Sequence, residues 1–558
     1  MILGEQRAGP ATTAPAGMTG RMTLDGLLRR AAEARPQAPA LVDAPNRPHV
    51  AGGEPRRFDW VGLDAAVDAL AGRLKAHAFP TDSVIATQFP LGSDGIVALL
   101  AVIRAGLIAA PLPLGWGRRE IVRHLQRLGA RAILTAGRAG PIDCADIMRF
   151  AAADAFSVRS VMSIGAPVLD GVVPLDEVLD AGTAIDPVET LRSGNAADHV
   201  ALVTADATAA GHVAVARSHN QLISGGLAAY MTGVPDETAV FAATLSPDAF
   251  AGLALQIVPW LMSGGTLIAH PPFAPRAFAD GLAASGATHA ILPAAAAACL
   301  FAPVPPAPAL RHIALLTRRP DEMAAALGVR PDGCAVDVFL GLGETGLARV
   351  VSSGAAAGIV AGADTFATGA GQAPVLVETR RGADGTLRLR GAMVPVSAFP
   401  PGAERGAPAV SRADPDGFVD TGLPVQDDAA ARLLIPGPVP EGVVAIGGRR
   451  FAESELRAAY AEAGGEIAPV LRDDPVLGQR VAGIVGDGRA MIGLAGRLAE
   501  TGLTPLGVPG GQRQQAGPLP FEDIRRGTSE PETEPDALLG MQAALEQILS
   551  TARTATGG

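Results

Sequence analysis

Strand-like and helical segments alternate along the first part of the chain, and this alternation limits the fold more than any other feature of the sequence. Four apolar residues recur at helical spacing on one face of 60–77: Leu63, Ala66, Leu70 and Leu74. The segments after it read in turn as strand, helix, strand, helix and strand: 83–88, 93–105, 106–113, 118–128 and 132–135. Strands separated by helices form parallel sheets with crossover connections, so the sequence predicts an α/β fold.

The alternation continues in the middle of the chain and then changes character. The predicted elements are a strand, a helix and a strand: 199–204, 218–232 and 266–269. From about residue 374 to 397, strand patterns are separated by turns at Gly382 and Gly385. This texture indicates a β-rich subdomain after the α/β part.

A proline-dense stretch at 436–440 is the best candidate for a hinge between domains. Residues 441–530 read as a compact α+β module, and a final helix carries an apolar stripe of Leu538, Met541, Leu545 and Leu549. That stripe fits either a face docked on the chain's own body or a helix that binds a partner. The predicted divisions are a flexible tail, a large domain, a small domain, and a linker with a terminal helix: 1–20, 21–436, 437–530 and 531–558.

Charge and cysteine usage exclude several functional classes. The net charge is −11 and no basic patch is visible, which argues against nucleic-acid binding. The three cysteines, Cys144, Cys299 and Cys334, are scattered without metal-binding spacing and suit a reducing cytoplasm. The first twenty residues lack the apolar core of a signal peptide, and the longest apolar run is interrupted by Arg104. We therefore expect a cytoplasmic protein without a membrane span.

Lysine is almost absent from the chain. Lys75 is the only one, so the other 44 of the 45 basic residues are arginine. The codon bias of a GC-rich genome is one explanation. Such a bias should nevertheless spare a lysine whose chemistry is needed, because arginine does not replace lysine freely.

Two long segments resemble the AMP-forming acyl-CoA synthetases, the adenylate-forming superfamily that includes luciferases and peptide-synthetase adenylation domains. They read MTLDGLLRRAAEARPQAPALVD and FDWVGLDAAVDALAGRLKAHAFPTDSVIATQFPLGSDGIVALLAVIRAGLIAAPLPL, and the similarity extends over roughly residues 20–530. The resemblance implies a large N-terminal domain of two sandwiched α/β subdomains plus a β-rich subdomain, then a small C-terminal α+β domain. These segments specify the fold and not the chemistry.

The family's phosphate loop usually reads TSGTTGxPKG, followed shortly by a serine–histidine pair. Here the flanks fit, with Ser218 and His219 in place, but the loop itself reads TADATAAGHVAVAR. It keeps Thr204, Thr208 and Gly211 as candidate nucleotide contacts. It also gains Asp206, which repels a triphosphate, while Arg217 stands at the wrong offset to replace the lysine. Phosphate loops need glycines, hydroxyls and a cation, so ordinary ATP binding is not expected.

The family's YGxTE motif matches Leu340-Gly341-Leu342-Gly343-Glu344, which lacks the adenine-stacking ring and the threonine hydroxyl. The resemblance implies Gly341 as a nucleotide contact and Glu344 as a magnesium ligand. A lone glutamate is alternatively a solvated or capping residue.

The motifs further along the chain are degraded in the same way. The TGD motif aligns on Thr421-Gly422-Leu423, so Thr421 remains but the ribose-binding aspartate is a leucine. At the hinge, Pro438 stands in place of the family's arginine. The catalytic lysine is missing from the C-terminal motif, where only Arg525 and Arg526 can supply a cation.

An acyl pocket is implied between the phosphate loop and the glutamate motif, lined by Phe250, Gly252 and Leu253 together with the segment THAILPAAAAACLF. A tightly packed alanine-rich helix is an equal alternative for that segment. Ser218 and His219 are adjacent and do not indicate a catalytic triad.

Two functions remain open from the sequence. The favoured one is a pseudoenzyme that has lost ATP-dependent carboxylate activation and binds an acyl group, an acyl-carrier protein or a true ligase. The alternative is a functional ligase that uses ATP with magnesium and passes the acyl group to CoA or a carrier thiol. The losses cluster at ATP-contacting positions while the apolar scaffold pattern is kept, which favours the pseudoenzyme.

Overall fold

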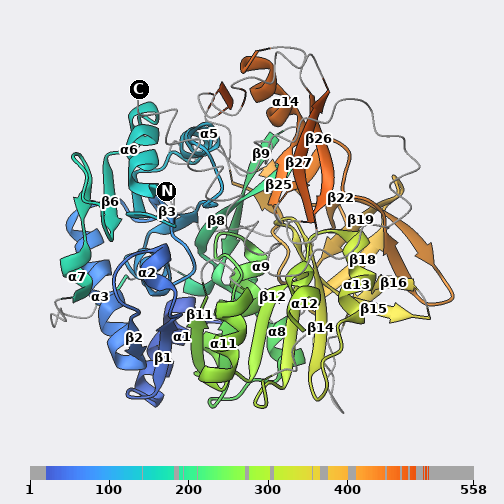
Figure 1. The fold of residues 1–558 in the computed structure, drawn as a ribbon, viewed down its shortest axis with the longest axis horizontal. Coiled ribbons are helices and arrows are strands. Elements are labelled where there is room, and N and C mark those ends of the chain that lie inside the picture. Colours follow the sequence, from blue (N-terminus) through green and yellow to red (C-terminus); the bar gives the residue numbers. More distant parts are fainter. Residues whose placement is uncertain are drawn as a thin grey trace.

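The structure is a computed structural model. It describes residues 20–501 except 141, 181–187, 191, 193, 210, 271–274, 302–306, 355, 365–374, 400–409, 447–448, 465–467, 475–477, 486–493, 495–496 and 499–500. Two large sheets dominate it, one of nine strands and one of 14 strands (Figure 1). No helix in this part of the chain is long and apolar enough to cross a membrane.

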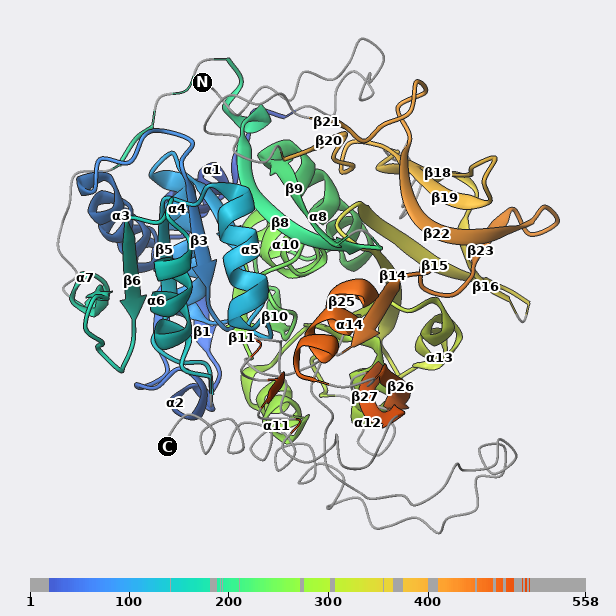
Figure 2. The same cartoon turned by 90° about the horizontal axis from the view of Figure 1, so that it is seen from above.

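The nine-stranded sheet is built around parallel strands in the order β8-β4-β3-β5-β6, as the alternation predicts. Its strands are β3 (Val84–Gln88), β4 (Ile108–Pro111), β5 (Ala132–Ala136), β6 (Ser160–Ile164), β7 (Val173–Pro174), β8 (Val200–Thr208), β9 (Gly211–Ser218), β20 (Ser397–Ala398) and β21 (Val410–Ser411). The helices in this part are α3 (Trp60–Ala76), α4 (Ser93–Arg104), α5 (Arg118–Leu128), α6 (Cys144–Asp154) and α7 (Asp176–Asp180), with a short 3-10 turn at Ala196–Asp198. Figure 2 shows them along the strands of this sheet.

The 14-stranded sheet has a parallel half and an antiparallel half. The parallel half holds β1 (Pro39–Asp43), β10 (Val240–Ala243), β11 (Thr266–Ala269), β12 (His289–Pro293), β13 (His312–Thr317) and β14 (Ala335–Leu342), with β2 (Arg57–Asp59) antiparallel at its edge. The helices of this half are α1 (Leu24–Ala34), α2 (Arg47–Val50), α8 (His219–Gly233), α9 (Phe250–Gly252), a π-helical turn (Leu253–Ile257), α10 (Val258–Ser263), α11 (Pro275–Ser285), α12 (Ala294–Phe301), a 3-10 turn (Pro320–Glu322) and α13 (Met323–Gly328). The segment that holds the alanine run is therefore a strand followed by a helix.

The antiparallel half forms the predicted β-rich part. It consists of β15 (Gly346–Ser353), β16 (Ala356–Val360), β17 (Gly362–Asp364), β18 (Val377–Arg381), β19 (Thr386–Arg390), β22 (Val419–Asp428) and β23 (Leu433–Pro436). β18 and β19 are a hairpin whose turn includes Gly382 and Gly385, where the sequence predicts it.

The strands that the structure describes after Pro436 form two separate two-stranded sheets and join neither large sheet. They are β24 (Val443–Ile446) with β25 (Arg449–Ala452), and β26 (Ala468–Asp474) with β27 (Gly478–Val485), and α14 (Glu453–Glu462) follows β25. We call this part of the chain the C-terminal segment. Its position outside the main sheets agrees with the predicted fold class, while the domain boundaries themselves stay predictions.

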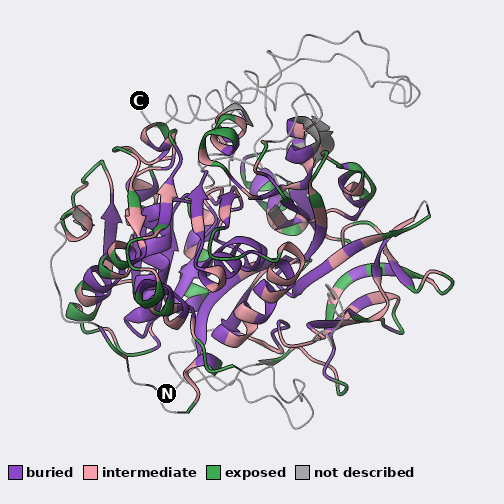
Figure 3. Cartoon of the chain, turned by 90° about the horizontal axis from the view of Figure 1, so that it is seen from below, coloured by how far each residue is buried: buried purple, intermediate pink, exposed green. Residues whose placement is uncertain are grey.

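The core lies between the two sheets. Every residue of α4 is buried: its apolar residues belong to the core, and Asp94 and Arg104 near its two ends form buried ion pairs with aspartates and arginines of neighbouring segments. Burial is concentrated in the strands and in the helices between the sheets (Figure 3). Trp60 stacks on Trp260 with ring centroids 5.2 Å apart, and the Trp260 indole donates a hydrogen bond to the Ala40 carbonyl at 3.0 Å.

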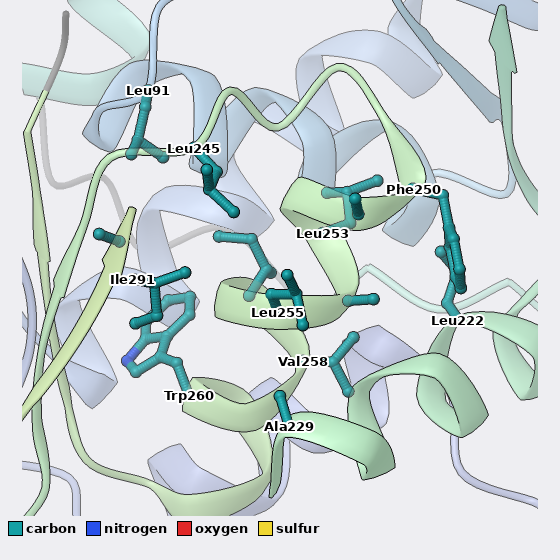
Figure 4. Packing of buried hydrophobic residues seen from close by; sticks show 14 of the residues in the cluster. Leu91, Leu222, Ala229, Leu245, Phe250, Leu253, Leu255, Val258, Trp260 and Ile291 are labelled. Atoms are coloured by element: carbon teal, nitrogen blue, oxygen red, sulfur yellow. The ribbon is translucent and has the colours of Figure 1, made fainter. Parts of the chain in front are cut away.

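Two adjacent glycines let α8 approach the π-helical turn. A Cβ on Gly225 would lie 2.4 Å from the Phe250 ring, and a Cβ on Gly226 would lie 2.2 Å from Val258. Figure 4 shows Phe250 beside Leu222 and Val258 beside Ala229, with Leu222 and Ala229 both on α8. Close packing of this kind leaves little free volume in the middle of the molecule.

Candidate functional site

The segment predicted as a phosphate loop is a β-hairpin. β8 and β9 pair in antiparallel register from Thr204 opposite Val215 to Thr208 opposite Gly211. The Thr208 hydroxyl donates to the Gly211 carbonyl at 2.9 Å and closes the end of the hairpin. β8 thus ends four residues beyond the predicted strand, which ends at 204. Successive N–H groups of a strand point to opposite sides, whereas a phosphate cradle needs successive N–H groups that converge.

The C-terminal segment covers the end of this hairpin. The Ser454 hydroxyl donates to the Ala209 carbonyl at 3.3 Å, and Glu455 Oε2 lies 2.7 Å from His212 Nδ1. A Cβ on Gly211 would lie 3.0 Å from Glu455 Oε1, so glycine at this position lets the glutamate approach. Figure 2 shows β25 and α14 beside the far end of β8 and β9.

Further contacts hold the C-terminal segment in place. Arg119 and Arg123 of α5 form ion pairs with Glu462 and Glu455, the second at 3.6 Å. One apolar cluster contains Trp116 and Val203 from the large domain together with Phe451 and Tyr460 from the C-terminal segment. Although burial alone would raise it, the pKa of Glu455 is lowered by the hydrogen bond and charge of His212 and by Arg123. Glu455 therefore belongs to the contact between the C-terminal segment and the β8–β9 hairpin with α5.

Glu344 is buried in the turn between β14 and β15. Its Oε2 accepts hydrogen bonds from the Thr204 hydroxyl at 2.7 Å and from the Phe250 backbone N–H at 2.9 Å. Only 3% of the residue is exposed, and this burial raises the pKa of its carboxyl against the opposing charge of Arg217. The structure thus brings Thr204, Phe250 and Glu344 together. One carboxylate oxygen has two protein donors, and the described residues contain no group of three or more side chains that could hold a metal ion.

Asp206 occupies the space that a side chain at position 343 would need. Asp206 Oδ2 accepts a hydrogen bond from the Glu344 N–H at 2.8 Å. Gly343 has a φ of +58°, and a Cβ there would lie only 2.4 Å from Asp206 Oδ2. A threonine hydroxyl at 343 and an aspartate at 206 are therefore incompatible in this arrangement. Asp206 and Gly343 both depart from the family pattern. They are far apart in the sequence but in contact in the fold, so each departure accommodates the other.

Arg217 stands behind this turn and is fully buried. Its guanidinium donates to the carbonyls of Met393, at 2.7 Å, and Glu344, and lies 3.5 Å from the centroid of the Phe250 ring. Burial lowers the pKa of Arg217 to about 9, although Glu344 opposes the shift. Its position in the chain gives the wrong offset for a phosphate-loop lysine, yet in the fold it lies directly beside Glu344.

The other two predicted nucleotide contacts, Gly341 and Thr421, are in contact with neighbouring residues of the protein. Gly341 packs against Arg318 and Leu316, and Leu340 is buried in the core. The Thr421 hydroxyl on β22 donates to the Leu387 carbonyl at 2.9 Å. Leu423, at the position of the family's ribose-binding aspartate, is 1% exposed.

The predicted pocket residues are core residues in this structure. Phe250 and Leu253 are at most 1% exposed, and a Cβ on Gly252 would lie 2.0 Å from the Ser246 carbonyl oxygen. The acyl pocket they were expected to line stays a prediction. A nearby cavity of about 10 Å³, roughly one water molecule, is lined by Thr87, Phe89, Gly95, Leu99, Pro111, Leu112, Pro247 and Asp248.

The one lysine of the chain lies away from this site. The Lys75 ammonium, on α3, donates to the Glu189 carbonyl far along the chain from every motif. Arg525, Arg526 and the terminal helix fall outside the described residues and stay predictions.

Part of the chain matches a known protein family. The AMP-binding enzyme family matches residues 28–358, more than half of the 558 residues. No curated protein matches the sequence significantly.

Solved structures match over most of the chain. The apo structure of MbtA from Mycobacterium smegmatis is 20% identical, with a TM-score of 0.60 over 88% of this chain and 91% of that one. The amide bond synthetase McbA from Marinactinospora thermotolerans is 19% identical, with a TM-score of 0.64 over 88% of this chain and 94% of that one. NpsA-ThdA from Klebsiella oxytoca, an artificially fused adenylation–PCP di-domain, is 15% identical, with a TM-score of 0.62 over 87% of this chain and 92% of that one. At these identities the structures support the fold alone. Together with the family match, they lead to the conclusion that this chain belongs to the AMP-binding enzyme family.

Proposed function

We propose that this chain has lost ATP-dependent carboxylate activation and acts as a binding or interaction module for an acyl group, an acyl-carrier partner or a true ligase. The observation that carries the proposal is the β8–β9 hairpin, which occupies the position of the phosphate loop and is covered by Ser454 and Glu455. A triphosphate needs converging N–H donors, and the strand pairing of the hairpin directs successive N–H groups to opposite sides.

Magnesium-ATP does not fit the residues of this site in four further respects. Glu344 is buried and one of its oxygens already accepts two hydrogen bonds. Asp206 adds a second negative charge next to it. Leu423 cannot accept hydrogen bonds from ribose, and the chain has no lysine after Lys75. Losing one positioned electrostatic group typically costs about 10²–10³ in rate, so several such losses approach the uncatalysed background.

A carrier protein is one chemically reasonable partner. One of the similar structures is an artificially fused adenylation–PCP di-domain, which supports a carrier protein as a candidate for this chain. The acyl group and a true ligase remain the other two candidates.

A functional ligase is the second candidate. It is favoured by the coverage of the fold, since 88% of this chain aligns with 94% of McbA, and by the retained Glu344. In that reading the chain would use ATP, magnesium and CoA or a carrier thiol. The hairpin would then have to open before the nucleotide binds.

The experiment that separates the two is carboxylate-dependent pyrophosphate release by the full-length wild-type chain. Short, long and aromatic acids are tested with ATP and magnesium, and an active member of the same family serves as the positive control. We expect the wild type to release no more pyrophosphate than a control reaction without protein. Release that depends on any of the acids would refute the proposal and establish the ligase.

A further inference from the structure

Two exposed phenylalanines lie on α6 and directly after it. Phe150, on the outward side of α6, is 44% exposed, and Phe156, which follows the end of the helix, is 87% exposed. Among the described residues no other phenylalanine, tyrosine or tryptophan is exposed. Aromatic side chains are enriched where protein surfaces make contacts, so this pair is a candidate contact surface.

The surroundings of these phenylalanines are positively charged. The guanidinium carbons of Arg149 and of Arg118 on α5 lie 4.4 and 5.7 Å from the centroid of the Phe150 ring, and α5 runs beside α6 (Figure 2). Arg118 pairs with Asp154 and Arg149 with Asp146, but residues 118–159 hold eight arginines against four acidic residues, in a chain whose net charge is −11. We call Arg118, Arg149, Phe150 and Phe156 the α6 face.

The end of the chain has the opposite charge and an apolar stripe. The predicted terminal helix carries Leu538, Met541, Leu545 and Leu549 at helical spacing, and residues 530–549 include five acidic residues and no basic one. Isolated helices of about this length are marginal in water, and Gly540 weakens this one further. A stable terminal helix therefore needs an apolar surface on which its stripe can pack.

The chain leaves its described part close to the α6 face. Arg497 Nε donates a hydrogen bond to the carbonyl of Ala463, the residue after α14, at 2.7 Å. Glu462, the last residue of α14, forms an ion pair with Arg119 of α5, which is the chain neighbour of Arg118 in the α6 face. The described residues end at Thr501, one turn beyond Arg497, whose carbonyl accepts from the Thr501 N–H at 3.1 Å.

The connecting segment is long enough to reach this face. Thirty-six residues separate Thr501 from Leu538, the first residue of the stripe. A flexible segment of that length spans about 30–35 Å on average. The helix can therefore reach the α6 face of its own chain, where its local concentration greatly exceeds that of a separate partner.

We propose that the α6 face is the docking surface of the terminal helix of the same chain. The stripe covers Phe150 and Phe156, and the acidic residues around the stripe face the arginines of α5 and α6. Docking ties the end of the chain to the large domain without a second protein. The inference goes beyond the proposed function, because no residue of the α6 face belongs to the site around Glu344.

The test is amide hydrogen exchange of the full-length protein, followed by mass spectrometry on peptides that cover residues 538–549. Because the helix is marginal alone, slow exchange of these amides reports docking. We expect Phe150→Ser and Phe156→Ser each to speed their exchange about tenfold or more, since each removes a buried aromatic side chain from the contact. Val61→Ser on α3 is the matched control, because Val61 is likewise exposed, at 49%, and this variant should exchange like the wild type.

Three outcomes would overturn the inference. Fast exchange at 538–549 in the wild type would mean that the helix does not dock. Slow exchange that survives both phenylalanine substitutions would place the helix on another surface. Slow exchange that is lost on dilution of the protein would make a second copy of the chain the occupant. If Phe150→Ser fails to fold by circular dichroism, Phe156→Ser decides, because a side chain that is 87% exposed contributes little to the fold. Pyrophosphate release by the wild type would refute the proposed function and leave this inference unaffected.

Discussion

Restoring the family's threonine at position 343 should destabilise this protein. Gly343 has a φ of +58°, a conformation that β-branched residues avoid, and forcing one there costs about 1–3 kcal/mol. The added Cβ would also lie 2.4 Å from Asp206 Oδ2 and 2.8 Å from Arg450 Nη1. Overpacking of this kind costs typically about 1–3 kcal/mol. We therefore expect Gly343→Thr to lower the free energy of unfolding by about 2–6 kcal/mol.

The assay is urea unfolding of the full chain, followed by tryptophan fluorescence and by circular dichroism. Asp206→Gly is combined with Gly343→Thr in a double-mutant cycle, because removing the aspartate removes the clash with its carboxylate and leaves only the close contact with Arg450 Nη1. We expect the double variant to be more stable, by at least about 1 kcal/mol, than the sum of the two single substitutions would give. The reasoning would be refuted if Gly343→Thr unfolded within about 0.5 kcal/mol of the wild type, the range of an unremarkable surface substitution.

Three further predictions concern the C-terminal segment, a missing cation and a buried thiol. The pKa of Glu455 is lowered in the folded protein, so its contribution to stability is full above the ordinary value of 4.5 and is lost as pH falls through the lowered pKa. Glu455→Gln should therefore weaken the fall of the melting temperature at acid pH. If the melting temperature of this variant fell with pH as in the wild type, the stabilising role of the contact between Glu455 and His212 would be contradicted. Arg526→Lys should show no carboxylate-dependent pyrophosphate release, because the nucleotide still lacks a ribose partner at Leu423 and a phosphate cradle at β8–β9; release by this variant would mean that the hairpin opens and binds phosphate. Burial raises the pKa of the Cys144 thiol to about 12, so a thiol reagent should modify it only after unfolding, and rapid modification mapped to this residue by mass spectrometry in the native protein would show that α6 is open.

Periodicity predicts elements well where the chain has an apolar face or a continuous apolar run. The predicted helix at 118–128 and strand at 266–269 coincide with α5 and β11. The end of β8 was missed because comparison with the family motif favoured a loop. A strand signal was present, since Thr204, Asp206 and Thr208 alternate with alanines at period two.

The site itself could be predicted only in part. Glu344 and Thr204 could be singled out from motifs, but their hydrogen bond joins residues 140 positions apart. The contact of His212 with Glu455 spans 243 positions, and no local pattern announces it. The steric link between Asp206 and Gly343 likewise appears only in the fold, although an unexpected aspartate and an unexpected glycine are both visible in the sequence.

Calorimetric titration with ATP tests the central claim most directly, because every carboxylate activation in this family begins with the nucleotide. The full-length wild type is titrated with ATP in magnesium and again in EDTA, with an active member of the same family as the positive control. We expect weak binding of ATP or none in either condition. A micromolar dissociation constant that depends on magnesium would contradict the account, since it would mean that Glu344 and the β8–β9 hairpin still form a working nucleotide site.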